Sequence, residues 1–336
     1  MLPKLSDRDA LRLAVHGYYF SCAIYAAVNL GIADALASGP RTAAELAEEL
    51  GTDADATERV LRLLVSVDLF ERDAEGRVSL TPVGACLRSD HEQSMAKEIR
   101  MFSGGEVYQT WGDLLESVRT GRCAFERRRG KPLFEWLSEQ PATADLFHQG
   151  WHEITTRVAR ETAEAYDFKG VSTITDVGGG YGIFLATVLA KVPGLRGVLF
   201  DLPISVRGAP DNFRNLGVAD RVSIVHGSAE ESVPAMELCT MKSVLHMCTD
   251  EQCVRILSRC AAALPRGGKL LVLERIIPDH DGYHWSKLVD VNMLVMTGGR
   301  ERTRAEYARL YDSSGLELTR CVPLASGFDI IEGLRV

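Results

Sequence analysis

The sequence predicts an α/β protein, with a doubly wound sheet in its C-terminal half and a mainly helical N-terminal domain. Three observations support this prediction: strand and helix patterns alternate from about residue 171 onward, a glycine-rich turn joins the first of these strands to its helix, and two helices followed by a hairpin lie upstream. With 336 residues, the chain is long enough for two domains, each with its own core.

The glycine-rich turn has the sequence Asp176-Val-Gly178-Gly-Gly180-Tyr-Gly182. Residues 171–177 are rich in β-branched side chains, which predicts a buried strand, and residues 183–191 repeat apolar side chains at helical spacing. Glycine accepts positive φ and lets a ligand approach the main chain, and the amides at a helix start favour polar or anionic groups. The turn is therefore predicted to hold a small molecule; the alternative is a tight turn without a ligand.

The residues around the turn indicate which small molecule it holds. The dinucleotide spacing G-x-G-x-x-G fails at Ile183, and no Lys-Ser or Lys-Thr follows as a P-loop requires. The carboxylate of Asp176 suits a cationic group better than a pyrophosphate. Asp201 closes the strand at 197–201, where an acid can accept both ribose hydroxyls. A positively charged nucleoside without phosphate fits S-adenosyl-L-methionine.

Composition argues against several classes of protein. The chain is 46% hydrophobic and 25% charged, as soluble proteins are, and its net charge of −8 disfavours nucleic-acid binding. The apolar stretch at 18–36 is interrupted by Asn29 and Asp34, so we expect no membrane span, and the N-terminus lacks the apolar run of a secretory signal. Because the eight cysteines form no C-x-x-C pair, we expect a reduced, cytoplasmic protein.

Residues 9–38 predict one or two helices that are apolar nearly all round. Such a helix needs partners on all sides. It is either a core helix or part of a subunit contact, and we favour the subunit contact.

A winged helix is predicted next. Thr42-Ala-Ala-Glu45 is a capping box for a short helix that ends at Gly51, and a second helix at about 55–67 and a hairpin at 69–81 follow. Residues 40–90 hold six arginines, no lysine and eleven acidic residues, which is too acidic for a DNA-reading module. A scaffold or dimerisation role is therefore favoured.

Residues 94–162 predict helices with many aromatic side chains. Most of these belong to a core, but some can line a pocket for a flat substrate. Trp151 and His152 lie nearest to the glycine turn in sequence and are our candidates for such a pocket.

Beyond Asp201, strands and helices alternate to the end of the chain. The predicted strands lie at about 222–225, 240–245, 269–274, 316–323 and 329–335; the predicted helices lie at 251–264 and 286–296, with a third from the capping box Thr303–Glu306 to Gly315. Ligands in such sheets sit at the carboxyl ends of the strands. Asp176, Asp201, Ser228 and His246 all fall at predicted strand ends.

Five motifs together resemble the small-molecule O-methyltransferases of plants and of bacterial antibiotic pathways. They are Asp176–Gly182, Phe200-Asp-Leu-Pro203, Lys242-Ser-Val-Leu-His246, Ala263-Leu-Pro-Arg-Gly-Gly268 and Gly298-Gly-Arg-Glu-Arg-Thr303. The resemblance covers nearly the whole chain, including Ser117–Gly121 and Phe134-Glu-Trp136.

The resemblance implies a class I methyltransferase with a Rossmann-like sheet and three segments: a winged-helix dimerisation domain at 1–95, a helical linker at 96–165 that contributes to the substrate pocket, and a catalytic domain at 166–336. It also implies a homodimer, S-adenosyl-L-methionine as methyl donor, a small-molecule acceptor and no metal.

The same resemblance implies roles for individual residues. Asp176, Gly178, Gly180, Asp201, Leu202, Ser228, Ala229 and Lys242 would bind the cofactor. His246 would be the general base, flanked by Glu274 and Glu301. Asn292, Met293 and Met296 join Trp151 and His152 as weaker candidates for the acceptor pocket.

The chemistry agrees with a base at His246. Methyl transfer is an in-line displacement at a sulfonium carbon, and a phenol with a pKa of about 10 needs a base of pKa nearer 7 to expose its lone pair. A lone histidine is more often a core residue, but its position after Lys242 at a strand end favours the base.

Two motifs depart from the family pattern. Met247-Cys248 replaces the usual Asp-Trp, and Gly227-Ser228 replaces Gly-Asp. His246, Cys248 and Cys253 lack an evident fourth ligand for zinc.

We therefore expect methylation of a hydroxyl, phenolic in kind, of a secondary metabolite or its precursor. The alternatives are a repurposed member that uses bound cofactor for decarboxylation, hydroxylation or cyclisation, an N- or C-methyltransferase, and a winged-helix regulator that senses a metabolite.

Overall fold

The computed structural model describes residues 6–336; residues 1–5, part of the N-terminus expected to lack a secretory signal, lie outside it. The chain forms two compact units: the first holds the chain up to Gln109 together with Ala142–Glu153, and the second holds Thr110–Pro141 and Ile154–Val336. The segment at 96–165, predicted as a linker, is divided between the two units. The three-part domain division stays a prediction.

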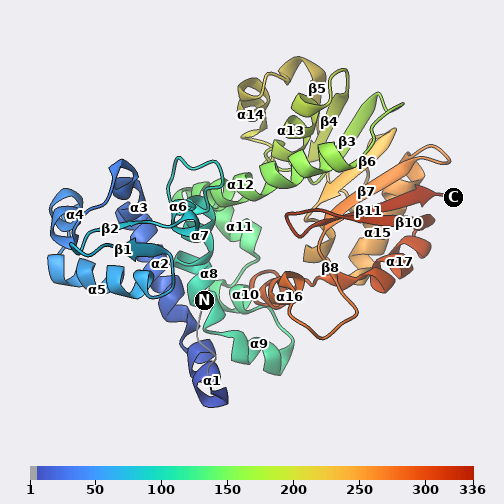
Figure 1. Ribbon diagram of the computed structural model, residues 1–336. Coiled ribbons are helices and arrows are strands. Elements are labelled where there is room, and N and C mark those ends of the chain that lie inside the picture. Colours follow the sequence, from blue (N-terminus) through green and yellow to red (C-terminus); the bar gives the residue numbers. More distant parts are fainter. Residues whose placement is uncertain (1–5) are drawn as a thin grey trace. The chain divides into compact units, whose positions relative to one another are not determined.

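The first unit contains the predicted winged helix, drawn in blue and cyan in Figure 1. Its elements are α1 (Asp7–Val15), α2 (Gly17–Leu30), α3 (Ile32–Ala35), the 3₁₀ turn η1 (Leu36–Ser38), α4 (Ala43–Leu50), α5 (Ala54–Val65), β1 (Phe70–Arg72), β2 (Val78–Leu80) and α6 (Pro82–Ala85). Thr42 and Glu45 form the predicted capping box, and Gly51 ends α4 in the left-handed region. The two helices α4 and α5 and the hairpin β1–β2 thus lie close to the predicted bounds.

Helices α1 and α2 leave apolar side chains exposed. Helix α1 buries none of its residues, and its Leu11 and Val15 are open to solvent, as are Tyr18 and Tyr19 of α2. No single helix within residues 6–336 has the length and apolar character to cross a membrane; only the bent pair Gly17–Leu30 and Ile32–Ser38 reaches that level jointly.

The predicted helical region is confirmed from residue 96 onward. Its helices are α7 (Ala96–Phe102), α8 (Gly105–Trp111), α9 (Leu114–Thr120), α10 (Ala124–Arg129), α11 (Leu133–Ser138) and α12 (Pro141–Ala165). Helix α10 begins at Cys123, whose sulfur accepts from the Glu126 amide, and ends at the left-handed Gly130.

The second unit holds a seven-stranded sheet with the order β10-β11-β7-β6-β3-β4-β5. The strands are β3 (Thr173–Val177), β4 (Arg196–Asp201), β5 (Val222–His226), β6 (Leu238–Lys242), β7 (Lys269–Glu274), β10 (Leu316–Pro323) and β11 (Asp329–Arg335). Strands β3 to β7 are parallel, whereas β11 runs antiparallel to β7 and β10. The connection at 324–328 is too short for a parallel crossover, which explains the antiparallel edge.

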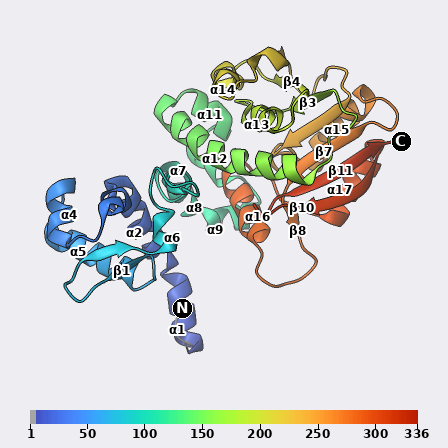
Figure 2. The same ribbon diagram turned by 45° about the horizontal axis from the view of Figure 1, so that its top comes forward.

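Helices pack on both sides of this sheet (Figure 2). They include α13 (Ile183–Lys191), α14 (Ala209–Asn215), α15 (Asp250–Ala263) and α17 (Arg304–Asp312), with a short 3₁₀ turn, η2 (Ala219–Arg221), before β5. Helix α16 (Trp285–Met296) packs mainly against α9, α10 and β8. The predicted doubly wound fold is confirmed, and its core is apolar: Cys239 and Met241 of β6, Leu270 and Val272 of β7 and Cys260 of α15 are all buried.

One predicted strand is longer than the observed one. The strand predicted at 240–245 ends at Lys242, Ser243 takes a φ of 56°, and Leu245–Met247 form a 3₁₀ turn, η3. A second difference is a parallel pair that we did not predict, β8 (Ile276–Ile277) with β9 (Arg302–Thr303). Together these features place His246 in a turn beyond the strand and bring residues 299–303 beside it.

Glu332 of β11 joins the end of α12 to the antiparallel edge. It accepts hydrogen bonds from Tyr166 Oη at 2.9 Å and Thr319 Oγ1 at 2.7 Å, and from Lys269 and Arg320. Burial alone would raise the pKa of Glu332, but the bonds from Thr319, Arg320 and Tyr166 outweigh it and lower the pKa to about 2.

We expect Glu332→Gln to lower the free energy of unfolding by roughly 1–3 kcal/mol near pH 7, since it weakens several charge-assisted hydrogen bonds. A glutamate in the unfolded chain has a pKa of about 4.3. Because the pKa of folded Glu332 is lower, the carboxylate stabilises the fold above about pH 4.3, and this stabilisation is lost as the pH falls toward 2. Urea unfolding should show a smaller difference in the free energy of unfolding between wild type and Glu332→Gln near pH 3 than at pH 7. Glu317→Gln, an exposed position on the same hairpin, is the control; equal losses in both variants would contradict the assignment.

Candidate functional site

The glycine turn between β3 and α13 is open on one side. Gly178, Gly180 and Gly182 have φ values of 72°, 53° and 69°, which L side chains rarely adopt. A Cβ on Gly178 would lie 2.6 Å from Val244, whereas a Cβ on Gly180 would meet no atom within 4 Å. The turn therefore leaves free space over Gly180, where a ligand can approach the main chain.

Asp201 closes the second strand and holds the glycine turn. Its Oδ2 accepts from the Gly180 amide at 2.8 Å, and its Oδ1 accepts from the Leu202 amide at 2.6 Å. Burial raises the pKa of Asp201, against the effect of these hydrogen bonds. Because each carboxylate oxygen has a second lone pair, Asp201 can still accept from a ligand.

Asp176 supports the turn from below. It is fully buried, its Oδ1 accepts from Thr240 Oγ1 at 2.8 Å, and its Oδ2 has no hydrogen-bond partner among the described residues. Burial raises the pKa of Asp176 to about 7, with a smaller contribution from Asp201 and opposition from Thr240 and Lys242. A direct contact with a cofactor stays a prediction for this residue.

Lys242 and Ser228 lie at the same edge of the sheet, because β3 to β6 are parallel. The Lys242 ammonium donates to Ser243 Oγ at 3.1 Å and lies 5.4 Å from the centre of the Phe328 ring. Burial, reinforced by Arg275, lowers the pKa of Lys242 to about 8. Ser228 and Ala229 follow β5, and Ser228 Oγ accepts from the Glu230 amide. Their cofactor roles stay predictions.

A buried cluster of His246, Glu274 and Glu301 lies beside this edge. His246 Nδ1 is 2.9 Å from Glu301 Oε1 and 3.3 Å from Glu274 Oε2. Glu274 Oε1 also accepts from the amides of Val244 and His246 at 3.0 and 3.3 Å. The acids therefore take the Nδ1 side of the ring, which fixes a proton there and leaves the Nε2 lone pair for another partner.

The acids change the proton affinity of the ring. Burial lowers the pKa of His246, but the charges of Glu274 and Glu301 outweigh burial and Lys242, so the pKa is raised. Burial, with help from Glu301, likewise raises the pKa of Glu274, although His246 opposes it. The cluster can thus accept and hold a proton on the imidazole.

The three side chains also bear on the question of a metal. One ligand atom from each lies within 4.8 Å of the others, which is close enough for a cation by geometry alone. His246 Nδ1, however, is already hydrogen-bonded to Glu301. The arrangement favours a proton between them, and a metal-free site stays a prediction.

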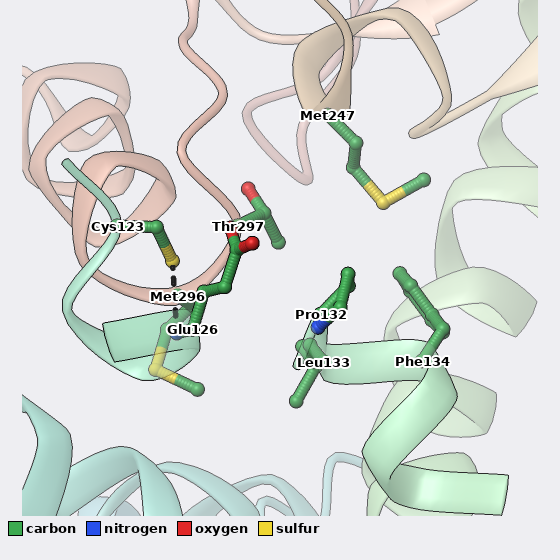
Figure 3. A pocket seen from close by; sticks show the side chains of 8 residues that line it. All are labelled: Cys123, Glu126, Pro132, Leu133, Phe134, Met247, Met296 and Thr297. Atoms are coloured by element: carbon green, nitrogen blue, oxygen red, sulfur yellow. Dashed lines mark hydrogen bonds between the residues drawn. The ribbon is translucent and has the colours of Figure 1, made fainter. Parts of the chain in front are cut away.

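A cavity of about 180 Å³ lies next to the turn that carries His246 (Figure 3). It is lined by Cys123, Glu126, Pro132, Leu133, Phe134, Met247, Met296 and Thr297. Met296 was a predicted pocket residue. The lining residues of α10 and α11 were missed, because the only signal for them in the sequence was the aromatic Phe134.

The other predicted pocket residues lie elsewhere. The Asn292 side chain accepts from Trp111 Nε1 at 2.9 Å, and Met293 is buried. Trp151 and His152 belong to the first unit, where Trp151 packs against Phe102 and Phe147. The pocket roles of these four residues stay predictions.

Comparison with known proteins identifies two matching families. Residues 111–317 match the O-methyltransferase domain, and residues 13–90 match the O-methyltransferase dimerisation domain. The chain is 36% identical over 319 residues to the phenazine O-methyltransferase of Lysobacter antibioticus, covering 95% of this chain and 93% of that protein. It is also 36% identical over 319 residues to the 3-amino-4-hydroxybenzoate 4-O-methyltransferase of Streptomyces cremeus, covering 94% and 87%.

A solved structure agrees with the sequence matches. A methyltransferase of calicheamicin biosynthesis in its S-adenosylhomocysteine-bound form superposes with a TM-score of 0.88 at 36% identity, and the similarity covers all of both chains.

The cluster predicts a measurable effect on the His246 ring. Glu301→Gln removes one of the charges that raise the pKa of His246 but keeps an amide oxygen near Nδ1, so the pKa should fall. NMR titration of ring-labelled histidine, with the His246 signal assigned by its loss in His246→Ala, measures this. Glu306→Gln, which alters a capping residue five positions away, is the control. An unchanged His246 pKa in Glu301→Gln would disprove the electrostatic coupling.

Proposed function

Since the chain belongs to the O-methyltransferase family, we propose that it methylates a phenolic hydroxyl of a secondary metabolite or its precursor, with His246 as general base. The observation that carries the proposal is the buried cluster in which two carboxylates hold Nδ1 of His246 and leave Nε2 available. Among the described histidines, His246 alone combines two properties: it follows a strand of the parallel sheet, and its ring lies within 4.0 Å of two carboxylates.

The residues at the sheet edge fit S-adenosyl-L-methionine, which supplies an electrophilic methyl group when bound. Gly180 leaves free space beside the main chain, and Asp201 keeps lone pairs for ribose hydroxyls. The unpartnered Oδ2 of Asp176 leaves an acidic group under the turn, and a cationic ligand would favour its ionised form whereas an anionic ligand would not.

His246 would take the proton of the acceptor hydroxyl on Nε2. The imidazolium so formed is stabilised by Glu274 and Glu301, whose charges raise the pKa of the ring and bring it closer to that of a phenol. The carboxylates orient the ring through Nδ1 and do not need to take the proton themselves. The role of each acid is therefore to hold and strengthen the base.

The cavity beside His246 would hold the acceptor. Its walls are mostly apolar, with Pro132, Leu133 and Phe134 on one side and the flexible Met247 and Met296 on others (Figure 3), which suits a flat aromatic molecule. Met247 stands where the family usually has an acid, so here that position offers packing instead of charge.

Glu126 is the only charged side chain among the described residues that line the cavity. A carboxylate favours an acceptor that carries a positive charge or a hydrogen-bond donor away from the reacting hydroxyl.

The dimerisation domain supports a homodimer, and we place the contact on the first unit. The exposed apolar side chains Leu11, Val15, Tyr18 and Tyr19 of α1 and α2 support this placement. Cytoplasmic location, and the absence of membrane and nucleic-acid partners, stay predictions from the sequence.

The main test is methyl transfer by wild type and His246→Ala with methyl-labelled S-adenosyl-L-methionine and a panel of phenols, read by product mass. Transfer should fall by about 10²–10⁴ in the variant, as for a lost general base. His280→Ala, an exposed histidine in the loop before α16, is the control and should keep wild-type activity.

Undiminished transfer in His246→Ala would remove the base from the proposal. A product that loses the mass of carbon dioxide, or gains an oxygen, without release of S-adenosylhomocysteine would instead support a repurposed member of the family. Label on nitrogen or carbon would identify an N- or C-methyltransferase.

The role of Glu126 can be tested with three 4-substituted phenols whose side chains differ in charge: tyramine (cation), 4-propylphenol (neutral) and 3-(4-hydroxyphenyl)propanoate (anion). Wild-type affinity, measured by calorimetry with S-adenosylhomocysteine present, should fall in that order by roughly two- to five-fold per step, the scale of a solvent-exposed charge pair. Glu126→Gln should make the affinities for tyramine and 4-propylphenol similar, whereas Glu116→Gln, at a partly exposed position of α9, should not. Any wild-type result without this order, including no binding of all three, contradicts the preference.

A further inference from the structure

Arg302 is buried beside the turn that carries His246, with about 1% of its surface exposed. Its Nη1 donates to the carbonyl oxygen of Leu245 and its Nη2 to that of Cys248, both at 2.9 Å. Its Nε and Nη2 also donate to Asp250 Oδ1, at 3.0 and 2.8 Å. One guanidinium thus hydrogen-bonds to Leu245 and Cys248, on either side of His246, and to Asp250 at the start of α15.

The position of Arg302 in the chain links this grip to the base. Arg302 begins β9, which pairs with β8. Strand β8 begins two residues after Glu274, the last residue of β7. Its neighbour Glu301 holds the ring of His246, so consecutive residues hold the side chain and the backbone of the same turn. The short pair β8–β9 is the element that delivers both.

Other contacts hold the His246 backbone in the same place. The Arg300 amide donates to the His246 carbonyl oxygen at 2.8 Å. Gly299 lies so close to this carbonyl that a Cβ on it would come within 1.9 Å of the oxygen. On the opposite side, Glu274 takes the amides of Val244 and His246. The turn is therefore held between residues 299–302 and Glu274.

The chemistry of Arg302 suits a clamp better than that of other residues. The Cys253 thiol also points at the Leu245 and Cys248 carbonyl oxygens, at 3.4 and 3.9 Å, but a thiol is a weak donor. A planar guanidinium can serve two carbonyls and a carboxylate at once, which the single ammonium of lysine cannot match. A buried charge is tolerated only when it is hydrogen-bonded in this way.

We propose that Arg302 is a positioning residue for catalysis, which keeps the Nε2 atom of His246 aligned by fixing the backbone of the turn at 245–248. The inference rests on His246 as the base. Arg302 is buried and spends its guanidinium on Leu245, Cys248 and Asp250, so its loss should lower the rate of transfer and leave binding of the cofactor nearly unchanged. A displacement of about 1 Å at a reacting group can cost about 100-fold in rate.

Arg302→Met and Arg302→Lys test this in the full-length protein, with Arg309→Met, an exposed arginine of α17, as the control. We expect kcat to fall about 100-fold in Arg302→Met and about 10-fold in Arg302→Lys, and to stay unchanged in the control. The KM for S-adenosyl-L-methionine and the Kd for S-adenosylhomocysteine should stay within about three-fold of wild type. Loss of S-adenosylhomocysteine binding in parallel with kcat in both variants would show a role in the whole fold and overturn the proposal.

A double-mutant cycle separates the clamp from the base. If Arg302 acts only through His246, Arg302→Met should add little to the loss already caused by His246→Ala. Losses that multiply would show that Arg302 acts by another route and would overturn the clamp, with the base intact. Full activity in the single variant His246→Ala would instead refute the base itself.

Discussion

The arrangement of the site in the second unit depends on the hydrogen-bond partners of the Glu274 carboxylate. This carboxylate is fully buried at the end of β7, and an ionised group there must find strong partners or lose its charge. Its Oε1 takes two backbone amides of the turn after β6, and its Oε2 faces His246 Nδ1. The amides are available only because the backbone leaves the sheet at Ser243, with a φ of 56°. The contacts of this one carboxylate thus coincide with the end of β6 and orient the ring of His246.

The parallel arrangement explains why this cluster lies beside the glycine turn. Strands β3 to β7 share one direction, so their carboxyl ends meet at one edge. Asp176, Asp201, Lys242 and Glu274 are far apart in the chain, but all four lie at that edge. Each of the four has a pKa shifted by burial, and such a concentration of desolvated charge is typical of sites that act on ligands. The antiparallel hairpin β10–β11 lies outside this group and closes the sheet on one side.

The sequence predicted what local chemistry decides. Capping boxes, left-handed glycines and the β-branched run before Gly178 have their causes within a few residues, and the elements they define were found close to their true bounds. The end of β6 was predicted three residues too far, because the acceptor that draws the backbone away is Glu274, some thirty residues downstream. Glu126 was missed for the same kind of reason: it reaches the cavity only through the packing of α10, which no periodicity reveals.

The apolar side chain of Met247 fits the same arrangement. A third carboxylate next to the ring would raise the proton affinity of His246 further, but Glu274 and Glu301 already hold its Nδ1, and Glu274 is itself destabilised as an anion by Glu301. Position 247 lines the cavity, where an acid would place a further charge in a mostly apolar wall. A thioether avoids this cost and fills the cavity wall instead. A change at position 247 therefore alters the cavity wall and leaves the ring of the base in place, because His246 faces the acids whereas Met247 lines the cavity.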